Sequence, residues 1–168
     1  MFALVDGVKR YIERRDSLET IDGDNKNRQN VYLSDTATSS VTFLLPATTS
    51  DPPPPPDTIA IGMSSSRYSS GELVPSYGKL EAGRGMRACN DTKHPEIHQN
   101  RWWKLILVRS NADHHEVHIM HHLSDASAPL YLGLIEGRPT LTVTPTAWYI
   151  STSAEIPPMS WRLPPLPV

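Results

Sequence analysis

The chain has 168 residues, with 16 basic and 18 acidic side chains and a formal net charge of −2. This balance excludes a protein that coats nucleic acid or an anionic membrane through bulk charge. No apolar run is long enough for a transmembrane helix, and the start MFALVDGVKRYIERR lacks the uninterrupted apolar core of a secretory signal. Cys89 is the single cysteine, so no intrachain disulfide can form, and we expect a reducing, cytoplasmic setting.

Short runs of β-branched and aromatic residues, together with 16 prolines, predict an all-β chain. Turn-forming residues bound each run, and no segment has a sustained 3.6-residue apolar period. The predicted strands, in chain order, are Val8–Arg15, Asn30–Asp35, Ser40–Ala47, Thr58–Met63, Glu72–Tyr77, Gly85–Asn90, Arg101–Val108, His115–His121, Leu130–Ile135 and Leu141–Ile150.

The predicted strands recur in a similar order. The runs KRYIERR, VYLSD, VTFLLP and TIAIG open the chain, and WWKLILV, EVHIM, YLGL and TLTVTPTAWYI close it. Three units of four short strands would account for Val8 to Ile150, and such threefold repetition predicts a β-trefoil, a closed barrel capped by hairpins. We expect this domain to span residues 1–152, with the strands Val8–Arg15 and Thr146–Ile150 closing the barrel.

Two segments are rich in proline. The run SDPPPPPD falls between the third and fourth predicted strands and should be a stiff polyproline II segment on the surface. Residues 153–168 form a Pro-rich C-terminal tail, where prolines forbid a central strand or a helix. We expect this tail to be extended, with Trp161 as the residue that pins it to the barrel.

Five of the seven histidines lie in the stretch NADHHEVHIMHHLS, Asn111 to Ser124. The zinc-protease motif His-Glu-x-x-His is absent, because one residue separates Glu116 from His118. On a strand, Val117 and Ile119 mark the core side. The residues expected to face solvent are then His114, Glu116, His118 and His122. Neighbouring imidazoles could share a metal, but a site needs further ligands, so we expect a polar strand face and no metal or cofactor.

No constellation points to catalysis. The run GRGMR lacks the spacing and the Lys-Ser/Thr pair of a phosphate loop. Cys89 would need a histidine and an acid beside it to act as a nucleophile, and a lone strand cysteine is more often a small core residue. We therefore expect a protein that is not an enzyme.

Several motifs resemble the fungal β-trefoil protease inhibitors called mycocypins, the clitocypins and macrocypins. LVDGVKRYIERR is similar to their first strand, SVTFLLPATTSDPPPPPDTIAIG to their third strand, Pro-rich loop and fourth strand, and RWWKLILVRSNADHHEVHI to their Trp strand and the next strand. EVHI, YLGL and WYI complete the pattern, so the resemblance covers most of the chain in short motifs. It implies a monomer that occludes the cleft of papain-like cysteine proteases.

In this family two loops of the first unit enter the protease cleft. The matching segments here are Asp16–Gln29, with Gly23, Asp24 and Asn25, and Thr48–Asp57, with Pro52, Pro53, Pro54, Pro55 and Pro56. A single epitope requires both segments to lie side by side at one end of the barrel. A further family loop corresponds to Ser64–Gly71, whose Arg67 suits the pocket of a trypsin-like protease.

Two alternatives stay open. A ricin-type lectin would bind a glycan, but its Gln-x-Trp motif is not met, since Gln99 and Trp102 are one residue too far apart. Alternation predicts that one of Trp102 and Trp103 is exposed and that Trp148 lies in the core. A non-enzymatic interaction scaffold would act through the Pro-rich segments, including RLPPLP in the tail.

Overall fold

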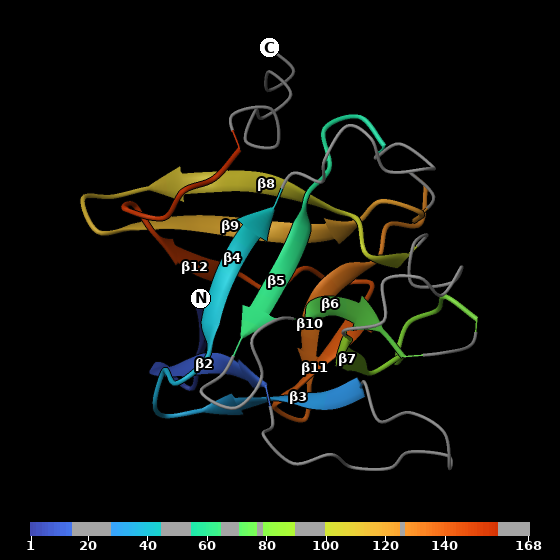
Figure 1. Ribbon diagram of the computed structural model, residues 1–168, viewed down its shortest axis with the longest axis horizontal. Helices are drawn as coiled ribbons and strands as arrows, with labels where there is room; N and C mark the ends of the chain where they lie inside the picture. Colours follow the sequence, from blue (N-terminus) through green and yellow to red (C-terminus); the bar gives the residue numbers. More distant parts are fainter. Residues whose placement is uncertain are drawn as a thin grey trace.

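The computed structural model describes residues 1–14, 28–44, 55–64, 71–76, 79–89, 100–124 and 127–157. Twelve β-strands form within these ranges, and all their pairings are antiparallel (Figure 1). The all-β prediction is confirmed. The strands are β1 (Phe2–Val5), β2 (Val8–Arg14), β3 (Arg28–Ser34), β4 (Ser40–Leu44), β5 (Ala60–Ser64), β6 (Glu72–Pro75), β7 (Met86–Cys89), β8 (Trp103–Ser110), β9 (His114–His121), β10 (Tyr131–Ile135), β11 (Arg138–Thr142) and β12 (Trp148–Ser151).

Two of these strands were missed in the sequence, and both adjoin a two-residue hairpin turn. Asp6 and Gly7 have φ angles of 51° and 78°, so they form a tight turn that pairs β1 with β2. Glu136 and Gly137, with φ angles of 50° and 72°, turn β10 into β11 in the same way. The single strand expected over Leu141–Ile150 is two, because β11 ends at Thr142 and β12 begins at Trp148.

The strands form one continuous sheet in the order β11-β10-β9-β12-β1-β2-β3-β7-β6-β5-β4, with β8 paired to β9. Isolated bridges join Ile59 to Trp103 and Gly85 to Thr140, so regions far apart in this order also meet. The expected direct pairing of Val8–Arg15 with Thr146–Ile150 was wrong. β1 lies between them and pairs with β12 on one edge and with β2 on the other.

Two tryptophans anchor the core of the last eight strands. Trp103 and Trp148 are fully buried, and each indole Nε1 donates a hydrogen bond to a leucine carbonyl, at 3.0 Å to Leu73 and 2.7 Å to Leu132. The core position of Trp148 is confirmed. Trp102 is also buried, so the expectation that one of the adjacent tryptophans is exposed was wrong.

Two charged residues are buried in the first four strands. Glu13 is 0% exposed, and its carboxylate accepts hydrogen bonds from the Thr38 amide at 2.6 Å, the Thr38 hydroxyl at 2.8 Å and the Ser39 amide at 2.7 Å. Arg14 is 2% exposed, and its Nη1 donates to the Met63 carbonyl at 3.1 Å. These contacts tie the connection between β3 and β4 to β2, and tie β2 to β5.

The beginning of the predicted tail packs onto the core. Ala154 and Ile156 are partly buried against it, while residues 158–168, including Trp161, lie outside the described residues. A search of the described part of the chain finds no helix with the length and apolar character needed to span a membrane.

Candidate functional site

Most of the residues expected to bind a protease lie outside the described residues, and their placement stays a prediction. They are Gly23, Asp24, Asn25, Pro52, Pro53, Pro54 and Arg67. The end of the Pro-rich segment is described: the Pro55 carbonyl accepts a hydrogen bond from the Thr58 hydroxyl at 2.6 Å, and Asp57 has a φ of 56°. Pro56 is exposed and Thr58 is buried, so this end of the segment is fixed to the sheet.

The strand residues from which the expected protease-binding segments leave the sheet, here called their roots, can be located on the β4–β5 hairpin. This hairpin pairs Ser40 with Ser64 at one end and Leu44 with Ala60 at the other. The Pro-rich segment connects Leu44 to Ala60. Segment 15–27 follows Arg14, whose amide donates to Ser39 Oγ at 3.0 Å and whose guanidinium bonds to Met63, so its root lies at the opposite end.

The two ends of this hairpin are about 14 Å apart, at roughly 3.4 Å per strand residue. One end adjoins β8 through the Ile59–Trp103 bridge, and the other faces β2 (Figure 1). The two segments expected to form one papain-binding epitope are therefore rooted at opposite ends. The segment that carries Arg67 begins after Ser64, so it shares a root with segment 15–27.

The histidine-rich strand alternates as expected, with Val117 and Ile119 in the core. On the outer face, Glu116 forms an ion pair with Arg109, and this hydrogen bond raises the pKa of Arg109. His118 is only half-exposed, which corrects the expectation of a solvent-facing imidazole. Burial lowers the pKa of His118, and the negative charge of Glu116 partly opposes that shift.

The other outward histidines are also covered in part. The His114 ring packs edge-on against Phe2 with centroids 5.1 Å apart, and the His118 ring lies 6.3 Å from Tyr131. His122 is half-buried. Among the described residues, no group of three or more His, Cys, Asp or Glu side chains is arranged to hold a metal ion.

His121 occupies the core side of β9 and is 0% exposed. Its Nε2 lies 3.1 Å from the Asn100 carbonyl, and its Nδ1 accepts a hydrogen bond from the Leu123 amide at 3.3 Å. This pattern requires the neutral tautomer with the proton on Nε2. Burial lowers the pKa of His121 to about 4, so the side chain is neutral at physiological pH.

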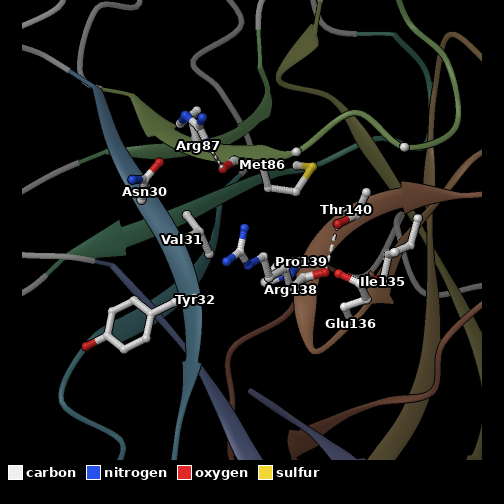
Figure 2. Close-up of a pocket in the computed structure, with 12 residues that line it drawn as sticks. Asn30, Val31, Tyr32, Met86, Arg87, Ile135, Glu136, Arg138, Pro139 and Thr140 are labelled. Atoms are coloured by element: carbon white, nitrogen blue, oxygen red, sulfur yellow. Dashed lines mark hydrogen bonds between the residues drawn. The ribbon is translucent and has the colours of Figure 1, made fainter. Parts of the chain in front are cut away.

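A pocket that the sequence did not reveal lies where three hairpins meet. It has a volume of about 610 Å³ and is lined by residues of β3, β7 and β11, the β10–β11 turn and the chain before β7 (Figure 2). The pairing of Asn30 with Arg87 and the bridge between Gly85 and Thr140 fix these strands around it.

We call this pocket, formed by β3, β7 and β11, the cap pocket, and its lining is polar and basic on one side. Figure 2 shows the Arg138 side chain reaching across toward β3, with Asn30 and Arg87 above it. Arg87 Nη1 donates to the Met86 carbonyl at 3.0 Å. The Arg138 guanidinium has no hydrogen bond or ion pair with any described residue, and Glu136 on the turn is exposed. Since each side chain comes from a different hairpin, no local motif could have grouped them.

Other candidates from the sequence prove to be core residues. Cys89 is fully buried beside Val74. Trp102, Trp103 and Trp148 are buried, so none of the described tryptophans offers a face on which a sugar could stack.

A scan against protein-family models, a search of curated proteins and a search of solved structures found no match to this chain.

Proposed function

We propose that this chain is a non-enzymatic β-trefoil that inhibits proteases by occluding their clefts. The observation that carries the proposal is a threefold recurrence of strand partners when the strands are grouped as β1–β4, β5–β8 and β9–β12. The first strand pairs with the second in β1–β2, β5–β6 and β9–β10. The second pairs with the third in β2–β3, β6–β7 and β10–β11. The fourth pairs with the first strand of the next group in β4–β5, β8–β9 and β12–β1.

Two further recurrences support the trefoil. The third strands of the groups gather together: β3 pairs with β7, β11 contacts both, and Gly85, just before β7, forms a bridge with Thr140 of β11. In the second and third groups, a Trp at the start of the fourth strand donates to a Leu carbonyl in the second strand, from Trp103 to Leu73 and from Trp148 to Leu132. A β-trefoil is the fold that the resemblance to the fungal inhibitors implies.

A rigid barrel suits inhibition, because segments held in place lose little conformational entropy when they enter a cleft. Segment 15–27, with Gly23, Asp24 and Asn25, and the segment that carries Arg67 are rooted beside each other, so one protease docked at this end would meet both. The Pro-rich segment with Pro52–Pro56 would act as a separate surface at the opposite end. A monomer in a reducing, cytoplasmic setting belongs to the same proposal.

A panel of papain-like and trypsin-like proteases, assayed with the full chain, tests this function. We expect inhibition of at least one class. Arg67→Ala should remove inhibition of the trypsin-like enzymes and leave inhibition of the papain-like enzymes unchanged, whereas the matched variant Arg84→Ala should change neither. If the wild-type chain at high micromolar concentration inhibits neither class, the proposal fails.

A further inference from the structure

The cap pocket contains a positive charge, on Arg138, that no described residue neutralises. Arg138 lies in β11 beside the turn that carries Glu136, yet the two side chains form no ion pair, and no other described acid pairs with Arg138. Arg87 on β7 adds a second guanidinium to the same wall. The unpaired guanidinium of Arg138 would attract an anion into this hollow.

Guanidinium groups favour oxyanions in particular. The planar fork of N–H donors on arginine matches the two oxygens of a carboxylate, a sulfate or a phosphate, and such charge-assisted hydrogen bonds are the strong ones. Asn30, which pairs with Arg87 across β3 and β7, adds an amide to the same side of the hollow. Gly83 and Gly85 form part of the wall without a side chain, which leaves room for a ligand beside the backbone.

The size and the remaining lining indicate more than an inorganic ion. A volume of about 610 Å³ falls in the range of pockets that hold small organic molecules. Tyr32 and Ile135 are 37% and 45% exposed and give the pocket aromatic and apolar surface, while Thr140 and Glu136 add oxygen atoms at its far side. A polyhydroxylated ring that carries one acidic group would use both halves of this lining.

We propose that the cap pocket binds an acidic monosaccharide unit, whose carboxylate or sulfate group lies between Arg138 and Arg87 and whose ring rests against Tyr32 and Ile135. This site lies on the third strands of the three groups and does not depend on protease inhibition. Glu136 limits the affinity for the anion through its negative charge.

Titration calorimetry of the full chain at low ionic strength tests the site with four probes: glucuronate, glucose 6-sulfate, neutral glucose and inorganic sulfate. We expect at least one of the two acidic sugars to bind about tenfold more tightly than glucose and than sulfate, since a charge-assisted pair adds to the ring contact. The better of the two acidic sugars identifies the group as a carboxylate or a sulfate ester. Equal binding of glucose, or binding of sulfate as tight as that of the acidic sugars, would overturn the proposal.

Three variants locate the binding. Arg138→Gln should weaken binding of the acidic sugar about tenfold, while Arg10→Gln, which removes the same charge from a distant ion pair with Asp35, should not. Glu136→Gln keeps an acceptor but removes the opposing charge, so it should tighten binding several-fold, a gain that a misfolded variant cannot produce. Unchanged affinity in both pocket variants, or amide NMR shifts that map away from β3, β7 and β11, would contradict the site.

Discussion

The first four strands and the last eight anchor their cores by different chemistry. In the last eight, two fully buried indoles, Trp103 and Trp148, fill the interior, and the N–H of each donates a hydrogen bond to a leucine carbonyl. In the first four, the buried large groups include a carboxylate, Glu13, and a guanidinium, Arg14, held by backbone and hydroxyl partners. The same pairing scheme accepts an aromatic or an ionic anchor, provided that the buried polar atoms find partners.

The two kinds of anchor should fail differently when they are changed. An indole stabilises mainly through the apolar area it removes from water, so its loss leaves a cavity. A buried carboxylate stabilises only through its partners, and its loss leaves donors without an acceptor. Substitution of each anchor in turn separates these two costs.

Removal of a tryptophan anchor should have the largest effect. Trp148→Ala leaves a cavity and frees the Leu132 carbonyl, and we expect it to lower the free energy of unfolding by about 4 kcal/mol. Urea denaturation followed by circular dichroism measures this change. Val41→Ala, which trims a partly buried side chain in the first four strands, should cost much less. A loss below about 1 kcal/mol for Trp148→Ala would show that the indole does not anchor the core.

Removal of the ionic anchor should come next. Glu13→Ala leaves the Thr38 amide, the Ser39 amide and the Thr38 hydroxyl without their acceptor, and we expect a loss of about 3 kcal/mol. The exposed Glu155 provides the control, because Glu155→Ala should cost less than about 0.5 kcal/mol. Equal effects of the two variants in urea denaturation would mean that the carboxylate contributes nothing beyond a surface charge.

The contrast between the two regions also marks what the sequence could and could not predict. Alternation in HEVHIMH and in the closing WYI run located β9, β12 and the buried Val117, Ile119 and Trp148, because side-chain period reports directly on the buried face. The burial of Glu13 could not be predicted, since its donors lie about 25 residues further along the chain. A charged residue in VKRYIERR reads as exposed unless those partners are known.

The two-residue turns carry sequence information on hairpins that the strand pattern alone does not give. Asp-Gly between two alternating runs is a strong local sign of a hairpin, and it would have revealed β1 before Val8 and the correct closure of the sheet. Glu136-Gly137 would have marked the β10–β11 hairpin in the same way and moved the start of β11 back to Arg138. The cap pocket is a different case, because Asn30, Arg87 and Arg138 come together only when three hairpins meet.

The smallest predicted effect concerns His121, a buried titratable group of the last eight strands, whose ring packs edge-on against Trp103 at 5.0 Å. Its folded pKa is lowered from an ordinary 6.5 to about 4, mainly by burial; the hydrogen bond to the Asn100 carbonyl opposes this shift, and the nearby His122 adds to it. Between these two pH values the unfolded chain binds the proton that the folded chain excludes, so stability is complete above about pH 6.5 and falls as the pH drops toward 4. We expect a loss of about 2 kcal/mol between pH 7 and pH 5, measured by urea denaturation at each pH.

His121→Phe, which cannot titrate, should be less stable at pH 7 because it loses the hydrogen bonds of the imidazole, yet it should lose much less stability on acidification. A slope that is unchanged in His121→Phe would show that groups other than His121 set the acid sensitivity of the fold.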